Sequence, residues 1–373
     1  MFKEEYLKIL APPKDRFEFN FLLKPPTIAA IISFIVLAIF SGVLTAEFVM
    51  WDDDVSIYRN AKLGRLSLER IYWAFTDVDS TMRYLPLSLL SWSLIYHYFG
   101  LDPFGYHLAN WLLHGLSAGV LFFIIRKILL LSRNRVTHTT FTDHRNITII
   151  AALATLCWAL HPLRVEPVAW ATDLTYCLAT FLLFVSTACY LEAVDSESNS
   201  RRYMSLMASA FIFYVFSLLS HAIGITYVAI LFIFDIFLFK RIGGERGWWR
   251  TQATKKVLLE KIILANPAVL ISVITVIVRV KSAGGWAPPV SLAEFGILDR
   301  AMQSVYIISY YLYRPFYPSD LAPVYTTLIS FEPLSWPFLV RALILLLLSS
   351  ILFVFGTMYQ FKAKMTGSVK VVV

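Results

Sequence analysis

Charged residues are scarce in this sequence. Only 16% of its 373 residues are Asp, Glu, Lys or Arg, whereas 58% are hydrophobic, and the mean hydropathy is +0.65. A soluble chain of this length needs far less apolar side chain to fold. The composition therefore excludes a protein that is soluble throughout, and lipid must cover the excess.

Cysteine is also rare, and its positions exclude two kinds of site. Cys157, Cys177 and Cys189 all lie in apolar segments without CxxC spacing, so neither a zinc site nor a disulfide framework is indicated. The sequence has no Gly-rich phosphate loop, which argues against a nucleotide site. It also has no tandem repeat of fixed period and no low-complexity linker, so we expect one bundle rather than two domains.

Apolar runs of about 20 residues recur along the chain, as a bilayer core requires of each spanning helix. They predict an all-α transmembrane bundle with about eight crossings, forming one domain over residues 1–364 with a short tail at 365–373. Short or aromatic segments at 85–99 and 301–317 are typical of interfacial helices. The predicted spans cover 27–48, 106–131, 147–160, a segment from about 168 to 191, two helices within 203–239 that break at Ser220-His221, 262–280, and a last span before Lys362.

The net charge of +8 comes from Lys and Arg in short loops, as positive-inside retention predicts, and does not indicate a nucleic-acid partner. Both termini are then cytoplasmic, and residues 49–105 form the first outer loop. The first apolar run follows a charged, Pro-containing stretch and is too long for a signal peptide's core. We therefore expect it to remain as the first span.

Three consecutive carboxylates, Asp52 to Asp54, follow Trp51 in this first outer loop. Tryptophan anchors at the membrane interface, which keeps the acids at the membrane surface. A carboxylate with like charge beside it and partial burial can take a proton at neutral pH. We predict that Asp52 and Asp53 are catalytic. A divalent metal at Asp52 and Asp53 is the less favoured alternative, because the sequence identifies no further oxygen ligands.

Other polar residues gather at the same outer side. His107, Asn110 and His114 form one stripe on the second predicted span, at i, i+3 and i+7. Such a stripe faces protein or water, either as a functional site or as an interhelical hydrogen-bond set. Further candidates are His161, Arg164 and Glu166 at the next outer corner and His221 in the later outer turn. Together they suggest a lipid-phosphate site, and loop anchoring is the alternative for Arg164 and His221.

Several motifs in order resemble the membrane half of the transmembrane-and-TPR O-mannosyltransferases, which belong to the GT-C superfamily of polyprenyl-phosphate-sugar glycosyltransferases. The resemblance covers about residues 48–235, with a weaker similarity at 317–325. It implies a GT-C bundle whose first outer loop holds the catalytic acid. The motifs are Trp51-Asp52-Asp53, Tyr84-Leu85-Pro86-Leu87, Gly100-Leu101-Asp102-Pro103 with Tyr106-His107-Leu108-Ala109-Asn110, Ala159-Leu160-His161-Pro162 with Val165-Glu166, and Leu218-Leu219-Ser220 with Asp235.

The sequence departs from the family pattern in four ways. Leu85 stands where the family has an arginine, and Arg83 is the nearest cation. Leu174 and Tyr176 replace a basic and an acidic residue, and His221 replaces a lysine. The TPR array is absent from this sequence, so acceptor selection would not depend on such repeats. These departures change the residues that would contact the donor phosphate in the family. Arg83 is the candidate substitute for the missing arginine.

The resemblance implies a glycosyltransferase that moves a sugar, mannose in the family, from a polyprenyl-phosphate donor to a protein or glycan hydroxyl on the outer face. The membrane would be a bacterial inner membrane, or the endoplasmic reticulum if the chain is eukaryotic. No cofactor is predicted. A transporter or flippase for a lipid-linked substrate is one alternative, but it requires charges or broken helices at mid-membrane. An inactive GT-C relative is the other.

Overall fold

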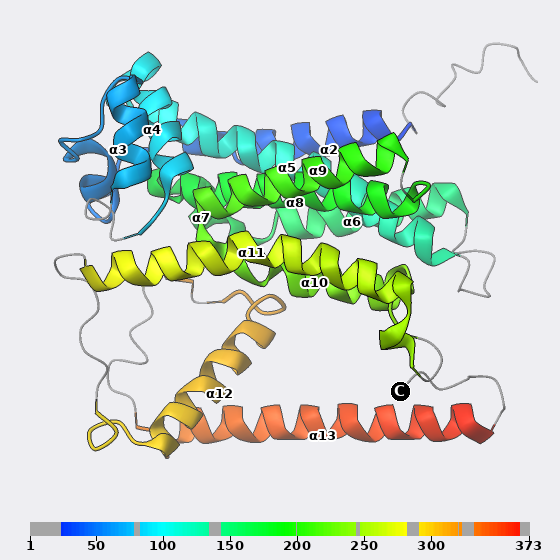
Figure 1. Cartoon of the computed structure of the whole chain (residues 1–373). Helices are drawn as coiled ribbons and strands as arrows, with labels where there is room; N and C mark the ends of the chain where they lie inside the picture. The colour runs from blue at the N-terminus through cyan, green and yellow to red at the C-terminus, as the bar shows by residue number, and fades with distance from the viewer. Residues whose placement is uncertain are drawn as a thin grey trace, which may run out of the picture.

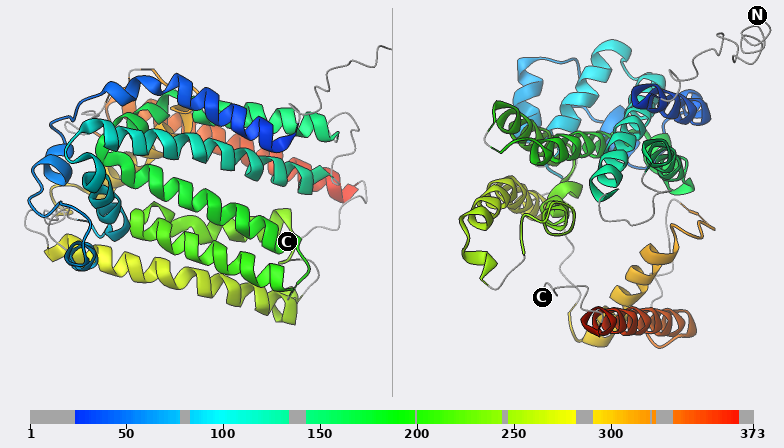
Figure 2. Two further views of the ribbon diagram at one scale, coloured as in Figure 1. Left: turned by 90° about the horizontal axis from the view of Figure 1, so that it is seen from above. Right: turned by 90° about the vertical axis from the view of Figure 1, so that its right-hand side faces the viewer.

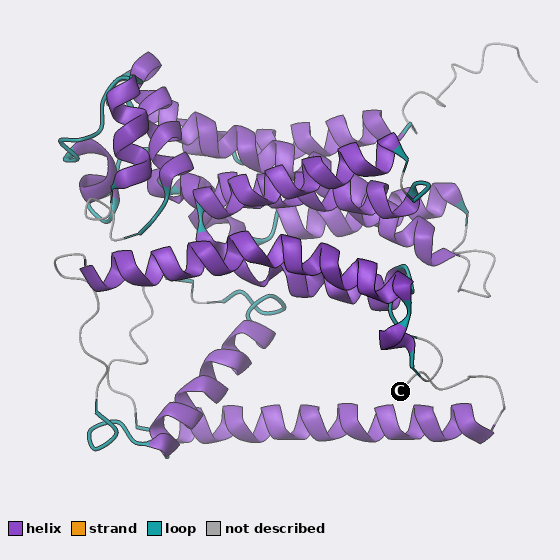
Figure 3. Cartoon of the chain, in the orientation of Figure 1, coloured by secondary structure: helices purple, strands orange, loops and turns teal. Residues whose placement is uncertain are grey.

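The computed structural model describes residues 24–77, 83–133, 143–198, 200–243, 247–281, 291–319, 321–322 and 332–365. Helices make up the regular structure, and no strand occurs in these ranges (Figure 3). The expectation of an all-helical chain is confirmed for this part. The lysines before residue 24 and the predicted tail after residue 365 lie outside it.

Most of the long helices run side by side, with α10 and α11 forming a layer beside the others (Figure 1). Proline in the first turn favours helix starts at α2 and α5, since its missing N–H is not needed there. At α5 the Asp102 side chain also caps the helix by accepting a hydrogen bond from Phe104 N at 3.0 Å. The helices of the bundle are α2 (Pro25–Ile39), α5 (Pro103–Ser132), α6 (His144–Ala159), α8 (Leu174–Asp195), α9 (Arg201–Ser220), α10 (Tyr227–Ile233) and α11 (Gln252–Lys281).

Five helices are long and apolar enough to cross a bilayer: α5, α8, α9, α11 and α13 (Trp336–Met365). A sixth crossing results if α6 and the segment Pro162–Ala169, bent by 60°, form one broken span. Two shorter apolar helices, Pro25–Ile39 and Ala222–Leu238, correspond to the two remaining predicted spans. The chain is therefore an integral membrane protein with five to six candidate spans by length and composition.

Residues 49–105, the predicted first outer loop, fold into helices at one end of the bundle. It contains η2 (Asp54–Tyr58), α3 (Leu68–Thr76) and α4 (Pro86–Phe99), and Figure 1 shows α3 and α4 at the end where α11 also finishes. With 14 residues α4 is too short to span, and its Trp92 side chain is buried in protein. The short 3₁₀ helix η1 (Ser41–Thr45) leads from α2 into this loop.

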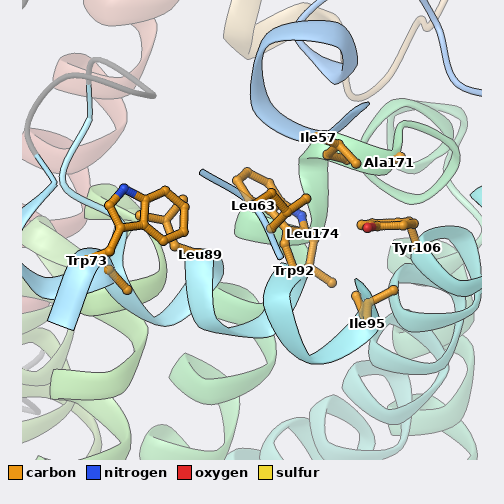
Figure 4. Close-up of a cluster of buried hydrophobic side chains, with 10 residues drawn as sticks. Ile57, Leu63, Trp73, Leu89, Trp92, Ile95, Tyr106, Ala171 and Leu174 are labelled. Atoms are coloured by element: carbon orange, nitrogen blue, oxygen red, sulfur yellow. The ribbon is translucent and has the colours of Figure 1, made fainter. Parts of the chain in front are cut away.

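An apolar cluster attaches this loop to the rest of the molecule. Trp73 of α3 and Trp92 of α4 pack in one cluster with Tyr106 of α5 and Leu174 of α8 (Figure 4). Burying aromatic side chains of this size stabilises the contact by about 1.5–3 kcal/mol each. Ala171 belongs to the same cluster, so the first loop is held against a second connection that is predicted to be outer and consists of η5 (Pro162–Arg164), α7 (Val165–Ala169) and η6 (Ala171–Asp173).

The third connection that is predicted to be outer is the turn between α9 and α10. α9 ends at Ser220, His221 is its C-cap, and η7 (Ala222–Thr226) begins the return. The predicted break at Ser220-His221 is confirmed. The Ser88 hydroxyl of α4 donates a hydrogen bond to the Ser220 carbonyl at 2.9 Å, so the first loop also contacts this turn.

The last two helices lie apart from the bundle when it is viewed along its length (Figure 2). α12 (Ile297–Tyr313) packs against α13, and Tyr306 contacts Phe338 with ring centroids 4.9 Å apart. α12 does not satisfy the length and hydropathy test for a span. The expectation of an interfacial segment at 301–317 remains a prediction.

A buried ionic network lies at the opposite end from the outer loops. Asp235 of η8 (Phe234–Leu238) is fully buried and pairs with Lys261 of α11 at 2.5 Å and with Arg241 at 3.1 Å. Arg241 also pairs with Glu260 at 2.7 Å, and the Tyr190 hydroxyl of α8 lies 2.8 Å from both Asp235 carboxylate oxygens. Between Arg241 and α11 the chain forms the short 3₁₀ helix η9 (Trp248–Arg250).

Candidate functional site

Asp53, one of the two predicted catalytic acids, is buried and fully engaged by protein donors. Its side chain is 1% exposed. Oδ2 accepts a hydrogen bond from Val49 N at 3.0 Å, and Oδ1 accepts from Thr172 N at 2.9 Å and from the Thr172 hydroxyl. Asp53 therefore joins the first outer loop to η6 of the second.

The two neighbouring acids have different surroundings. Asp52 is exposed, and no side-chain hydrogen bond or ion pair is found for it among the described residues. Asp54 is half-buried and forms an exposed ion pair with Arg59 at 3.5 Å, which contributes little to stability. Only Asp52 of this run is thus both accessible and without a partner in the described part of the chain.

A cavity of about 490 Å³ opens at the same end of the molecule. Four segments far apart in the sequence form it: residues 83–85 just before α4, Tyr176 of α8, the turn after α9, and the C-terminal part of α11. Two arginines, Arg83 and Arg279, line it together with the predicted donor-site residue His221. The other lining residues are Tyr84, Leu85, Tyr176, Ala222, Ile225, Ser272, Thr275 and Val276.

His221 is positioned to donate a hydrogen bond into this cavity. Its Nδ1 accepts a hydrogen bond from Ile223 N at 3.2 Å, so the proton of a neutral ring lies on Nε2. Burial, and after it the charge of Arg83, lowers the pKa of His221 to about 4. The ring is neutral at pH 7 and serves as a donor rather than as a cation. Burial also raises the pKa of the Tyr84 hydroxyl beside it, which keeps that group protonated.

The polar groups of the cavity suit an oxyanion. The hydroxyl oxygen of Thr275 is buried without a hydrogen-bond partner in the described chain. Arg279 has no carboxylate partner among the described residues. Two guanidinium groups, a neutral imidazole N–H and a hydroxyl form the donor set that a phosphate group requires. Apolar neighbours such as Ile225 and Val276 suit the chain of a lipid.

The polar stripe of α5 lies deeper in the protein. His107 is 1% exposed; neither ring nitrogen has a hydrogen bond of good geometry, although the Glu47 backbone and the Asp53 charge lie close to the ring. Asn110 donates to the Trp170 carbonyl at 2.7 Å and ties α5 to the second outer connection. These two residues support the loops, and neither lines the cavity that contains Arg83.

His114 and Arg164 line a second, smaller cavity of about 100 Å³, which shares Tyr176 with the first. His114 Nε2 donates to the Ala159 carbonyl at 2.9 Å. The Arg164 guanidinium lies over the Trp158 ring at 5.6 Å, and its Nε is buried without a hydrogen-bond partner in the described chain. These two predicted residues therefore line a different cavity from Arg83 and His221, and Tyr176 borders both cavities.

The remaining two predicted residues differ in their roles. His161 uses both ring nitrogens within the protein, since Nδ1 accepts from Leu163 N at 3.2 Å and Nε2 donates to the Pro315 carbonyl at 2.8 Å. It therefore anchors the second outer connection to the end of α12. Glu166 is exposed, and its charge acts on Asp173 and Tyr176.

Two ionisable residues of this region were not predicted from the sequence. Asp173 is 8% exposed and lies among the charges of Glu166, Arg83, Asp53 and Asp52. Arg279 falls inside the apolar run that predicts the seventh span. Asp173 is an isolated ionisable residue before a long apolar stretch, and such residues are functional candidates by default. Arg279 stands with Lys281 at the end of its apolar run, so the sequence gives no such signal for it.

A metal centre finds no support among the described residues, where no group of three His, Cys, Asp or Glu side chains is arranged to hold an ion. The Asp53 oxygens, which the alternative of a divalent metal would use, already accept three hydrogen bonds from protein groups. The geometry favours phosphate binding by cations and N–H donors.

Replacing Asp53 by Asn is expected to lower thermal stability. In the variant, the amide nitrogen that replaces one carboxylate oxygen cannot accept the hydrogen bond from Val49 N. The negative charge that strengthens the bonds from Thr172 is also lost. The two losses together cost about 1–3 kcal/mol. Asp52→Asn, made at an exposed site, should melt like the unchanged protein. Thermal unfolding of both variants in detergent tests this, and equal melting temperatures would contradict the structural role of Asp53.

Comparison with known proteins gives distant relatives. The chain is 29% identical to protein O-mannosyl-transferase TMTC2 of Homo sapiens over 213 residues, which are 55% of this chain and 23% of the relative. It is 25% identical to protein O-mannosyl-transferase Tmtc3 of Drosophila melanogaster over 201 residues, 50% of this chain and 22% of the relative.

The chain spans about a quarter of the length of the curated relatives it matches. No protein-family model matches it, and no solved structure matches it significantly. The resemblance read from the sequence motifs is confirmed at this distance: over about half its length, the chain is a distant relative of the TMTC protein O-mannosyl-transferases.

Proposed function

We propose that this chain is a membrane glycosyltransferase that transfers a sugar, mannose by analogy with its relatives, from a polyprenyl-phosphate donor to a hydroxyl group of a protein or glycan. The observation that carries the proposal is the cavity of about 490 Å³ at the outer end, where Arg83, Arg279 and His221 converge beside carboxylates. The distant relationship to O-mannosyl-transferases supports the same reaction class.

In this proposal the donor phosphate binds to the two guanidinium groups, the His221 Nε2–H and the Thr275 hydroxyl. These donors stabilise the negative charge that grows on the phosphate as the bond to the sugar breaks. The polyprenyl chain leaves the cavity between the turn after α9 and α11, along Ile225 and Val276. The sugar then faces Tyr176 and the carboxylates of the two outer loops.

Transfer of label from a polyprenyl-phosphate mannose to a hydroxyl-bearing peptide, by the purified chain in lipid vesicles, tests the proposal. A glycosyltransferase forms labelled peptide and frees the polyprenyl phosphate. A transporter or flippase would move the donor between leaflets and form no peptide product. The buried charges of the described spans favour a glycosyltransferase, since Asp235 and Lys261 are paired with each other rather than lining a path.

We further propose eight crossings with both termini in the cytoplasm, of an endoplasmic reticulum or bacterial inner membrane, and the cavity on the lumenal or outer side. In a background without the native cysteines, a cysteine at Glu69 of α3 should react with an impermeant maleimide from the outer side. Cysteines at Arg201 and appended to the C-terminus should react only after permeabilisation. A C-terminal cysteine that reacts from outside would mean that α12 crosses the membrane.

A further inference from the structure

A groove of about 1080 Å³ lies between the C-terminal part of α12, with the segment that follows it, and residues 336–352 of α13. It shares no lining residue with the cavity that contains Arg83 and Arg279, so it is a separate site. Pockets for small ligands usually measure about 300–1,000 Å³. The groove therefore has room for a ligand as large as a lipid.

One cation in this groove stands alone in an apolar helix. Arg341 is the only charged residue among residues 333–361, and an ionisable residue in such a helix is a functional candidate whose partner must be named. The centre of its guanidinium lies 4.6 Å from the Tyr306 ring centroid and 4.7 Å from that of Tyr313. Its Nη2 donates a hydrogen bond to the Tyr313 hydroxyl at 3.3 Å, and no carboxylate pairs with it in the described chain. The tyrosines thus position the positive charge without neutralising it.

The place of Arg341 along α13 suits a lipid headgroup. The helix begins at Trp336, which is 73% exposed, and tryptophan anchors at the membrane interface. Arg341 follows five residues later, about 8 Å along the axis, and side chains in a helix point back toward its N-terminus. Figure 1 shows that α13 begins at the end of the molecule where α3 and α4 lie. The guanidinium is therefore placed to meet a phosphate on the side of the candidate functional site.

The wall of the groove beyond Arg341 suits acyl chains. From Arg341 to Leu352, the last lining residue of α13, the helix rises about 16 Å. This is about half of a hydrocarbon core roughly 30 Å thick, which is the length of acyl chains in one leaflet. A polyprenyl chain is longer than one leaflet and would extend past the groove. The apolar residues of this wall are Val340, Ile344, Leu345, Leu348, Ile351 and Leu352.

The charge of the groove favours a negative headgroup. Arg341 contributes a positive charge, and no Asp or Glu occurs among the described residues that line the groove. A phosphatidylcholine molecule would bring its ammonium group close to the guanidinium, and like charges repel. A phosphatidylglycerol headgroup carries the phosphate charge and two hydroxyl groups, and the hydroxyl groups of Tyr317 and Ser319 also line the groove. An anionic phospholipid therefore complements the site.

We propose that the groove between α12 and α13 binds one molecule of an anionic phospholipid. Its phosphate accepts hydrogen bonds from the Arg341 guanidinium, and its acyl chains cover the apolar wall of α13. Basic pockets between membrane-spanning helices bind lipid headgroups in this way. The site is separate from the donor cavity and requires no sugar transfer, so its test is independent of the proposed function.

Native mass spectrometry of the purified chain, titrated in detergent with phosphatidylglycerol or phosphatidylcholine of the same acyl chains, tests the site. The unchanged chain should bind one phosphatidylglycerol on the order of 10-fold more tightly than phosphatidylcholine. Arg341→Leu should lower phosphatidylglycerol affinity by on the order of 10-fold or more, because charge-assisted hydrogen bonds are lost. Arg126→Leu removes an equal charge from a half-buried arginine of α5 and should leave the affinity within about twofold.

Two neighbouring leucines test the acyl-chain part of the groove. Leu348 lines the groove and Leu347 does not, although both are exposed, by 47% and 62%. Leu348→Trp should lower phosphatidylglycerol affinity several-fold, because the larger ring takes the space of the acyl chains, whereas Leu347→Trp should not change it. Both variants keep Arg341 and its tyrosine contacts, so they decide the question even if Arg341→Leu folds poorly.

Four outcomes would overturn the proposal. Equal affinities for phosphatidylglycerol and phosphatidylcholine would show that the groove does not recognise a negative headgroup. Unchanged phosphatidylglycerol affinity in Leu348→Trp would place the lipid elsewhere. Polyprenyl phosphate that binds more tightly than phosphatidylglycerol, and loses its affinity in Arg341→Leu, would assign the groove to the donor's lipid. A purified dimer that Leu348→Trp converts to a monomer would make the groove an interface between two copies of the chain.

Discussion

Replacing Arg83 and Arg279 together by Leu is expected to weaken binding of a polyprenyl-phosphate sugar by on the order of 1000-fold. Hydrogen bonds to charged groups contribute about 1.5–3 kcal/mol each, and each guanidinium can offer the phosphate two parallel bonds. The double variant leaves only His221, neutral because its pKa is lowered to about 4, and the Thr275 hydroxyl. Equilibrium binding of labelled donor to the purified variants measures the effect.

The matched control removes two arginines from the other side of the protein. Arg201 and Arg202 are exposed at the start of α9, so their replacement by Leu changes the net charge equally without touching the cavity. Donor affinity should then stay within about twofold of the unchanged chain. Equal losses in both double variants would show that net charge, rather than the cavity, determines donor binding.

A conservative substitution tests the geometry of the same site. Arg279→Lys keeps the charge but loses the planar fork that matches two phosphate oxygens. Its donor affinity should therefore lie between that of the unchanged chain and that of Arg279→Leu. An affinity equal to the unchanged chain would mean that Arg279 contributes only as a point charge.

The helices could be predicted from the sequence because each depends on local pattern. The break at Ser220-His221 follows from a run too long for one helix, and the structure ends α9 at Ser220. The starts of α2 and α5 follow from proline in the first turn. Helix lengths were less predictable. α11 begins at Gln252, ten residues before the predicted span, because charged residues in its first turns hide the apolar pattern.

The site could be predicted only in outline, because its geometry depends on contacts between distant segments. Nothing local to Asp53 indicates that Thr172 saturates one of its oxygens, so Asp53 looked as accessible as Asp52. Arg279 looked like the end of a span, and its place beside His221 and Arg83 requires the packing of α11 against the turn after α9. The sequence grouped the acidic run with Arg83 and His221, but it did not indicate which carboxylate is free.

The buried network at the end of the bundle opposite the cavity should determine much of the stability of the bundle. Lys261 is 2% exposed and pairs with the fully buried Asp235, while its Nζ donates to the Tyr190 hydroxyl at 2.6 Å. Together with Arg241 and Glu260 the network contains two positive and two negative charges, so it is balanced. Balance is what makes such burial tolerable, since each isolated ion costs several kcal/mol to desolvate.

Lys261→Met is therefore expected to lower the free energy of unfolding by about 3–5 kcal/mol, because it leaves one buried carboxylate without a countercharge. Adding Asp235→Asn restores neutrality and should recover most of that loss, since the amide still accepts from Arg241 and Tyr190. Unfolding in detergent, followed by tryptophan fluorescence, measures the single and double variants as a cycle. A double variant whose loss equals the sum of the two single losses would show that Asp235 and Lys261 are not coupled, and that packing rather than charge balance holds α8, η8 and α11 together.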